Sequence, residues 1–449
     1  MSTATLLRRS FHLAASRTLL ATAIALLASA ALAGATDATP TFYADVLPLL
    51  QENCQTCHRP AGENIGGMIA PMQLMTYEDA RPWARSIAKA VQARDMPPWF
   101  ATEATRGQFH HERVLSDEQI ATFVDWARGG ALAGDPEQAP APKQFVEEGS
   151  GGWSLGTPDL VVPMPRYFVA DEIADININF TTQLTAEQLP EEVWVRGVEF
   201  RVGGVNVHHM CASANEKGAQ VQALGKFGGN SLGCIALGAE SQMFPDGYAM
   251  RMPAEAKIGF SMHYNKEPGE GSGFWDQSEI GFHFADPSEA AQLREILYAP
   301  IGNITFEIPP GVERWKVGSA QVFPVETDLL ALWPHAHLRA VAARYEAVYP
   351  DGSRELLLDV PEYDQEWQTT YQYKQPKRIP AGTRVEVTMW YENSPQRAAE
   401  RGFDSADATI NGTATTDEMM LGFVNYSLSR PVSELQMVYG IEPEPSDAP

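Results

Sequence analysis

The residue composition and the spacing of apolar residues change at one stretch of the sequence, and this change constrains the fold more than any other feature. Residues 134–152 are rich in Pro, Ala, Gly and acidic residues and predict a linker. Before it, residues 40–132 carry apolar side chains at helical spacing. From Trp153 onward, short runs rich in β-branched and aromatic residues alternate with Gly, Pro, Asn and Asp. We therefore expect a multidomain chain with a small α-helical domain followed by β-structure.

Three apolar faces predict helices in the first part of the chain. They lie at residues 42–50, 83–91 and 120–127. Ser116 precedes the third face and Gln119 follows three residues later, which is a capping-box pattern. Two glycines follow the last face and predict its end.

The β-rich part predicts two antiparallel β-sandwiches of jelly-roll-like type. The runs V-W-V-R-G-V-E-F-R-V, I-G-F-S-M-H-Y, D-L-L-A-L-W and T-R-V-E-V-T-M-W-Y indicate strands. Because about 290 residues are too many for one sandwich, we expect one over residues 153–300 and another over 301–440. The division should fall near residues 298–312, and an acidic tail should cover residues 441–449.

Composition and charge exclude several classes of function. The chain is 44% hydrophobic, so it can bury real cores, and it has 57 acidic against 33 basic residues, a net charge of -24. Such a charge repels phosphate backbones, so no binding of nucleic acid is expected. No later stretch approaches the roughly 18 continuous apolar residues of a membrane helix. We therefore expect no membrane span after the N-terminal signal is cleaved.

The N-terminus carries the pattern of an export signal. Arg8, Arg9 and Arg17 accompany an apolar run at residues 19–32, and small residues follow it. We expect residues 1–35 to be a signal peptide and the mature protein to be periplasmic or secreted. A retained membrane anchor is the alternative, but the small residues of a cleavage site favour export.

The chain has four cysteines, all of them outside the signal. Cys211 and Cys234 stand alone in the β-rich part. In an oxidising compartment such a pair predicts a disulfide, and two buried thiols are the alternative.

Cys54, Cys57 and His58 form the motif C-Q-T-C-H, which is typical of a covalently attached c-type haem. The thiols bind the haem, and the adjacent histidine becomes an axial ligand of its iron. A thioredoxin-like pair would need a βαβ context, and a zinc site would need a second ligand pair. We therefore expect one haem c.

The sixth ligand of that haem should be a methionine. Met96, in D-M-P-P-W, is the candidate, and Met68, Met72 and Met75 are alternatives. Residues 36–133 resemble the class I-like cytochrome c domains of exported bacterial proteins. The resemblance implies that the methionine of an M-P-P-W loop is the ligand. Ligation by His and Met raises the reduction potential and suits electron transfer.

Five of the ten histidines form clusters in the β-rich part. His335 and His337 form H-A-H, and a strand would place both imidazoles on one side. The adjacent His208 and His209 cannot share a side in a regular strand, so they need a strand end or a bulge. Together with His263, these residues predict metal ligation, and polar core histidines are the alternative.

The order of these clusters resembles the type II, ascorbate-dependent copper monooxygenases, such as peptidylglycine α-hydroxylating monooxygenase and dopamine β-monooxygenase. The similarity covers about residues 195–428, in the blocks V-H-H-M with a Cys just after, M-H-Y, H-A-H and T-D-E-M. It implies two copper ions and a disulfide between Cys211 and Cys234 near the first. The implied ligands are His208, His209 and His263 for one copper, and His335, His337 and Met419 for the other, where O2 is activated.

The last block contains Met419 and is followed directly by a second methionine, Met420. In a strand Met419 and Met420 would point to opposite sides, so only one can bind copper. The family pattern D-E-M selects Met419, whose soft sulfur favours Cu(I). Met420 is then a packing residue.

Three positions depart from the family. Trp333, Leu421 and Phe423 stand where the peptidylglycine enzyme has an Arg, an Asn and a Tyr that hold the carboxylate of its substrate. A buried carboxylate would lose these partners at a cost of several kcal/mol. Peptidylglycine is therefore not expected, and an apolar or aromatic small molecule fits better.

The sequence thus predicts an exported haem-c-fused copper monooxygenase that hydroxylates a C–H bond with O2. A periplasmic donor would supply electrons, and the haem would pass them to the three-histidine copper, since the linker keeps the two close. Two alternatives stay open. One is a non-catalytic periplasmic redox or copper-binding electron-transfer protein, and the other is a structural β-module.

Overall fold

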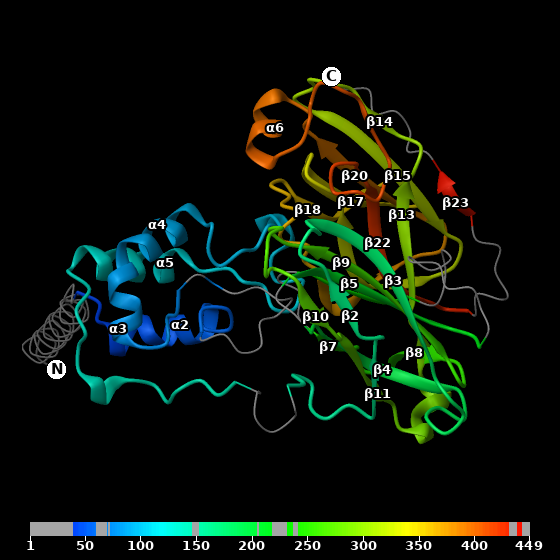
Figure 1. Ribbon diagram of the computed structural model, residues 1–449, viewed down its shortest axis with the longest axis horizontal. Helices are drawn as coiled ribbons and strands as arrows, with labels where there is room; N and C mark the ends of the chain where they lie inside the picture. The colour runs from blue at the N-terminus through cyan, green and yellow to red at the C-terminus, as the bar shows by residue number, and fades with distance from the viewer. Residues whose placement is uncertain are drawn as a thin grey trace, which may run out of the picture.

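The computed structural model describes residues 39–59, 70, 72–145, 152–203, 206–217, 231–236, 241–430 and 438–441. The expected signal peptide, Met68, residues 146–151 of the expected linker and residues 442–449 of the expected tail lie outside these ranges. The helices before residue 139 form one body beside a larger assembly of β-sheets (Figure 1). Within the described ranges, no helix has the length and apolar character needed to cross a membrane.

The helical part packs around one small core. Its elements are η1 (Phe42–Val46), α2 (Leu47–Asn53), α3 (Tyr77–Ala80), η3 (Arg81–Trp83), α4 (Ala84–Ala93), η4 (Glu103–Thr105), α5 (Asp117–Arg128) and η5 (Pro136–Gln138). Phe42, Leu50, Val91, Phe123 and Trp126 are among the side chains buried together. The three expected helices are therefore confirmed.

The capping signals act as the sequence predicts. Ser116 accepts a hydrogen bond from the backbone N–H of Gln119, whose side chain accepts one from the Ser116 N–H. The helix ends at Arg128, directly before Gly129. α4 ends at Ala93 because Arg94 adopts a left-handed conformation with φ of 62°.

Two larger sheets and a small one enclose the first β-core. One contains β1 (Leu160–Pro163), β11 (Glu279–Phe284), β4 (Val193–Arg201), β8 (Tyr248–Met252), β12 (Arg294–Glu295) and β7 (Gln242–Met243). The other has the order β3 (Asp175–Gln183), β9 (Lys257–Asn265), β5 (Val207–Asn215), β6 (Ser231–Ala236). β2 (Tyr167–Val169) pairs with β10 (Phe274–Asp276). The pairings are antiparallel except that of β12 with β8.

The second β-core lies between two further antiparallel sheets. One has the order β13 (Leu297–Asn303), β22 (Met420–Leu428), β16 (Thr327–His335), β19 (Tyr371–Ile379). The other has the order β18 (Arg354–Val360), β17 (Ala340–Val348), β20 (Thr383–Tyr391), β15 (Trp315–Phe323), β23 (Val438–Ile441). A small pair, β14 (Glu307–Ile308) and β21 (Thr409–Ile410), and two helices, η6 (Pro287–Gln292) and α6 (Pro395–Arg401), complete the described elements.

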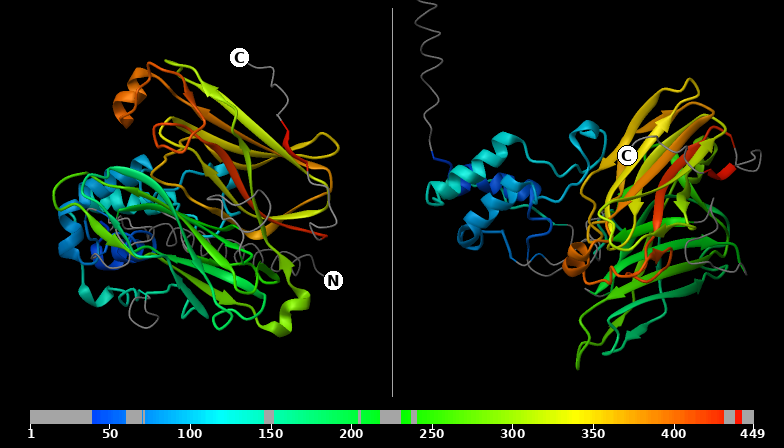
Figure 2. Two further views of the ribbon diagram at one scale, coloured as in Figure 1. Left: turned by 45° about the vertical axis from the view of Figure 1, so that its right-hand side comes forward. Right: turned by 90° about the horizontal axis from the view of Figure 1, so that it is seen from above.

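This arrangement agrees with the expected β-sandwiches. The four sequence runs predicted as strands form β4, β9, β16 and β20. Each pair of large sheets shares one buried apolar cluster. The chain passes from the first pair to the second between β12 and β13, close to the expected division. Figure 2 shows the two pairs of sheets side by side, with the helical part against one flank.

A segment of the helical part reaches onto the second pair of sheets. Residues 97–113, which we name the tongue, run between α4 and α5. The His110 N–H donates to the Gln372 carbonyl over 2.8 Å, and the Lys374 N–H donates to the Gln108 carbonyl over 2.8 Å. Phe109 is fully buried in the second β-core. The tongue thus adds a short antiparallel bridge at β19 and fixes the helical part there (Figure 2).

The first part of the expected linker is also held in place. The Gln51 side-chain amide donates to the Ala141 carbonyl over 3.1 Å, and Lys143 Nζ donates to the Gln51 carbonyl over 2.8 Å. Residues 139–143 therefore lie along the end of α2.

Candidate metal centre

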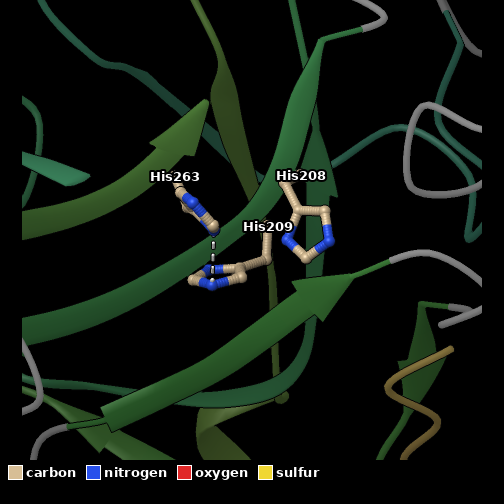
Figure 3. Close-up of side chains that lie close together, drawn as sticks. All are labelled: His208, His209 and His263. Carbon is tan, nitrogen blue, oxygen red and sulfur yellow. Dashed lines mark hydrogen bonds between the residues drawn. The ribbon is translucent and has the colours of Figure 1, made fainter. Parts of the chain in front are cut away.

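Three histidines meet where β5 and β9 pair. His209 lies opposite His263 on the neighbouring strand, and the pairing shifts register between Val207 and His209. This irregularity at the start of β5 lets the adjacent His208 and His209 face the same partner, as the sequence predicts. One nitrogen from each of the three rings lies within 4.8 Å of the others. Figure 3 shows the three imidazoles converging from the two strands.

The nitrogens of this cluster are arranged as a metal site requires. His263 Nε2 lies 3.2 Å from Asp175 Oδ2, so the proton on Nε2 faces the carboxylate. Nδ1 of His263 is then a lone-pair nitrogen, 3.2 Å from His209 Nε2 (Figure 3). Both ring nitrogens of His208, and Nδ1 of His209, are buried without a hydrogen-bond partner among the described residues, and the carboxylate oxygen Oε2 of Glu366 lies 3.7 Å from His208 Nε2. Such groups are costly unless something binds them, so the donor set fits a metal ion.

Asp175 is the main polar partner of this cluster. Its side chain also accepts hydrogen bonds from Asn265 over 3.1 Å and from the Thr415 hydroxyl over 2.7 Å. Burial would raise the pKa of Asp175, but hydrogen bonds with His263 and Thr415 outweigh it and lower the pKa to about 2. A carboxylate of this kind orients a metal-binding imidazole and increases its basicity.

The second cluster begins at the end of β16. The strand ends at His335, so His337 reaches the site from the turn that follows, and not from within the strand as H-A-H suggests. The two rings are nearly perpendicular, with centroids 5.5 Å apart. Nδ1 of His335 lies 2.6 Å from Gln368 Oε1, and Nδ1 of His337 lies 3.3 Å from the Asp417 carbonyl. Each Nδ1 therefore faces an acceptor, which leaves Nε2 for a metal.

The two methionines of T-D-E-M lie in different surroundings. Met420 is fully buried in the second β-core, where it is a packing residue. Met419 is half-buried and packs against the buried cluster that contains Cys211, Tyr298 and Trp333. Trp333 in turn lies 5.3 Å from the His335 ring. Met419, and not Met420, thus packs against the cluster whose Trp333 lies next to His335.

Burial keeps these imidazoles neutral. It lowers the pKa of His335 to about 4 and the pKa of His337 to about 3. Burial, followed by the four surrounding histidines, holds the pKa of His209 well below its ordinary value. Because only a neutral imidazole has a lone pair for a metal, these three residues are prepared for binding near neutral pH.

The two clusters adjoin. The His209 and His335 rings are nearly perpendicular, with centroids 5.9 Å apart. They come from different pairs of sheets, so the five histidines form one group at the contact between the pairs.

An aromatic stack covers one side of this group. Tyr298 stacks on Phe423 with centroids 5.0 Å apart, and Phe423 stacks on Trp333 at 4.6 Å. This stack packs against the disulfide of Cys211 and Cys234, which the structure confirms. A cavity of about 90 Å³ is bounded by Tyr298, Trp333 and other mostly apolar side chains. Trp333 and His335 are two residues apart in β16, so they lie on the same face of the strand.

The C-Q-T-C-H motif lies directly after α2. Cys54 and Cys57 are thiols, and burial followed by the nearby Cys57 raises the pKa of Cys54 to about 12. His58 Nδ1 lies 3.0 Å from the Met72 carbonyl, which leaves Nε2 for an iron. The residues present therefore fit a covalent haem ligated by His58.

The same contact helps to rank the candidate sixth ligands. The Met72 carbonyl lies on the Nδ1 side of His58, away from the nitrogen that would bind an iron, which disfavours Met72 as the sixth ligand. Met96 is 39% exposed at the end of the loop that leads into the tongue, and it belongs to none of the buried clusters of the described residues. Met75 is half-buried.

Sequence reasoning missed the polar partners of the ligands. Asp175, Gln368 and Thr415 carry no local pattern that distinguishes them from other polar residues. Glu418 stands within T-D-E-M, a pattern that indicates only Met419 as a ligand. Glu418 is fully buried and accepts hydrogen bonds from the backbone N–H groups of His337 and Arg339 over 2.9 and 2.6 Å. Burial raises the pKa of Glu418 to about 7, although these N–H groups oppose the rise.

Comparison with known proteins gives little further information. No family model and no curated protein matches the chain. A Paenibacillus xanthan lyase structure is 10% identical, with a TM-score of 0.16, over 67% of this chain and 28% of the lyase. The VP2 subviral particle of infectious bursal disease virus is 9% identical, with a TM-score of 0.17, over 68% and 88% of the two chains. The chain thus spans little more than a quarter of the lyase, and similarities this weak carry no argument about fold or function.

Proposed function

We propose that the protein is an exported haem-c-fused copper monooxygenase, which inserts one oxygen atom of O2 into a C–H bond of a small apolar or aromatic substrate. The observation that carries the proposal is the convergence of His208, His209 and His263, which have three buried ring nitrogens without a hydrogen-bond partner among the described residues. The His335 ring adjoins this cluster at the contact between the pairs of sheets. The cytochrome c character of the helical part and the jelly-roll type of the sandwiches belong to this proposal.

The ligands divide into two sets. His208, His209 and His263 would hold one copper through three nitrogens, while His335, His337 and Met419 would hold the other through two nitrogens and a thioether. Bound copper supplies the one-electron redox chemistry and the activation of O2 that hydroxylation needs. Gln368 and the Asp417 carbonyl orient the rings of the second set through contacts with Nδ1 of His335 and of His337.

The surroundings of the second set favour an apolar substrate. Trp333, Leu421 and Phe423 are buried together beside Met419. An aromatic face excludes water from the ligands and offers no cation to a carboxylate. The cavity next to Trp333 would take a small hydrocarbon or an aromatic ring after a side-chain movement that enlarges it.

The helical part would provide electrons. A haem attached at Cys54 and Cys57, with His58 and Met96 as axial ligands, would accept single electrons from a periplasmic donor and supply them to the three-histidine copper. The tongue keeps this part against the second pair of sheets. Trp99 packs on Tyr371 with ring centroids 5.1 Å apart, and Tyr371 pairs with Leu332 of the strand that carries His335.

A specific observation favours the second candidate, a non-catalytic copper-binding electron-transfer protein. The cavity beside the aromatic stack holds only about 90 Å³, which is far below the roughly 300 Å³ or more of ordinary ligand pockets. In this alternative the same residues bind haem and copper, but no organic substrate reaches them.

One set of measurements separates these candidates. Metal analysis of periplasmically matured protein should find one iron and two coppers, and His335→Ala should lose one copper while His111→Ala, an exposed histidine, keeps both. Oxygen uptake with reductant should then depend on an apolar or aromatic substrate, with a hydroxylated product detected by mass spectrometry, and should be absent with peptidylglycine. Copper without product in every substrate class would favour the second candidate, and iron without copper would overturn both.

A further inference from the structure

The loop at residues 411–419 contacts both sets of ligands. It belongs to the second pair of sheets, joins β21 to β22 and carries Met419. Nevertheless, it contacts β3 of the first pair, because the Thr415 hydroxyl donates a hydrogen bond of 2.7 Å to Asp175 Oδ2. The same hydroxyl lies 3.5 Å from His263 Nε2. The Thr413 carbonyl accepts a second hydrogen bond from the Asn177 side chain of β3 over 3.1 Å.

Asp175 connects this loop to the first set of ligands. One oxygen receives the Thr415 hydroxyl and the Asn265 amide, and both oxygens lie within 3.3 Å of His263 Nε2. Hydrogen bonds to an ionised carboxylate are roughly twice as strong as those between neutral groups. The position of Thr415 is therefore coupled to the orientation of the His263 ring.

The same loop also fixes the second set. The Asp417 carbonyl faces His337 Nδ1 at 3.3 Å, and Glu418 accepts the backbone N–H of His337 over 2.9 Å. Asp417 also accepts the Ala414 N–H over 3.3 Å, which closes the loop on itself. From Thr415 to Met419, the chain is thus a short, internally bonded connection between the two sets.

We propose that Asp175 and Thr415 are positioning residues that hold the two ligand sets together as one compact two-copper centre. The inference rests on the proposed function, since it takes copper as the ion. It is supported by the 5.9 Å separation of the His209 and His335 rings, which belong to different sets. The Asn177–Thr413 hydrogen bond and the apolar cluster of the aromatic stack also join the two sides, whereas the Asp175–Thr415 hydrogen bond acts on the carboxylate that faces His263.

The contact can be removed without leaving a charge unpaired. In Thr415→Val, Asp175 retains His263 and Asn265 as partners, and valine has nearly the shape of threonine. Thr415→Ser retains the hydroxyl and should behave as the original protein. Thr416→Val is the matched control, because Thr416 is the exposed neighbour and its carbonyl, not its side chain, bonds Arg339.

The test loads the full chain with copper(II) alone and records copper content and electron paramagnetic resonance spectra. The original protein, Thr415→Ser and Thr416→Val should bind two coppers and show the half-field signal and broadening of a close copper pair. Thr415→Val should also bind two coppers but show two isolated signals. Asp175→Asn, a second variant in case Thr415→Val does not fold, should weaken copper binding at the three-histidine set by about 10- to 100-fold.

Other results would contradict either the positioning role or the proposed function. Isolated signals in the original protein, an unchanged copper pair in Thr415→Val, or unchanged affinity in Asp175→Asn would overturn the positioning role. Fewer than two coppers in the original protein would overturn the proposed function itself.

Discussion

His209 and His335 lie in different pairs of sheets, yet their imidazole rings stand nearly perpendicular with centroids 5.9 Å apart. The relationship makes the candidate metal centre a property of the whole β-assembly. Neither pair of sheets contains the five histidines alone, so the contact between the pairs has to form before the complete centre exists. We therefore expect side chains that orient the rings at this contact to affect metal affinity as strongly as the strands that carry the ligands.

Gln368 should be one such residue. Its side-chain oxygen lies 2.6 Å from His335 Nδ1 and fixes the ring with Nε2 toward the site. We expect Gln368→Leu to lower the copper affinity of the second set by about 10- to 100-fold, because the ring loses its acceptor. Competition titration with a chelator of known affinity measures the effect.

The controls for Gln368 separate the hydrogen bond from packing. Gln368→Glu retains an acceptor oxygen and should keep most of the affinity. Gln396→Leu makes the same change at an exposed position of α6 and should have no effect. Equal loss of affinity in the Leu and Glu variants would contradict the role of the acceptor.

Local features of the fold were predictable because local sequence determines them. The capping box at Ser116 and the strands β4, β9, β16 and β20 follow from spacing and residue type within one segment. The irregularity at His208 also does, since two adjacent histidines that face one partner need a strand end or a bulge. The disulfide between Cys211 and Cys234 was predictable from the cysteine count together with the expected export of the chain.

Features that depend on distant pairing were not predictable. The partners of Phe109 are Tyr371 and Tyr373, more than two hundred residues away, and no periodic pattern links them. Asp175 meets His263 only because β3 pairs with β9, and it meets Thr415 only because the two pairs of sheets pack together. A single sequence contains the residues but not the topology that joins them.

The sixth ligand of the proposed haem can be tested through the reduction potential of the iron. A thioether opposite His58 raises the reduction potential of the iron, so Met96→Ala should lower it in a spectroelectrochemical titration. Met75→Ala is the matched control and should leave the potential nearly unchanged. A fall in potential for Met75→Ala alone would assign the ligand to Met75 instead.

The tongue should stabilise the whole chain through Phe109. This side chain is fully buried, and its ring centroid lies 4.9 Å from Tyr373 and 5.5 Å from Tyr371. Replacing a buried Phe by Ala removes about 3–5 kcal/mol from the free energy of unfolding. In Phe109→Ala, we expect that loss in urea unfolding together with new proteolytic cleavage within the tongue. Phe168→Ala is the control, since Phe168 is 43% exposed, and a loss of similar size there would show that Phe109 has no special role.

The contribution of His335 to the stability of the metal-free protein should fall as the pH decreases below 6.5. Burial lowers the pKa of His335 to about 4, so between these values the unfolded chain takes up a proton that the folded protein excludes. The stabilising contribution is therefore complete above pH 6.5 and is lost as the pH falls to about 4. One residue contributes up to about 3 kcal/mol, at about 1.4 kcal/mol for each pH unit.

This pH effect is isolated by comparison with a variant. Glu418 acts in the opposite sense, because its pKa is raised to about 7 and its folded form keeps a proton that the unfolded chain releases. The difference in unfolding free energy between the original protein and His335→Gln removes this background. Measured by urea unfolding in chelator, the difference should shrink by up to about 3 kcal/mol as the pH falls from 6.5 to 4. The exposed His111→Gln should follow the original protein at every pH, and parallel curves for His335→Gln would show that His335 is not held neutral by burial.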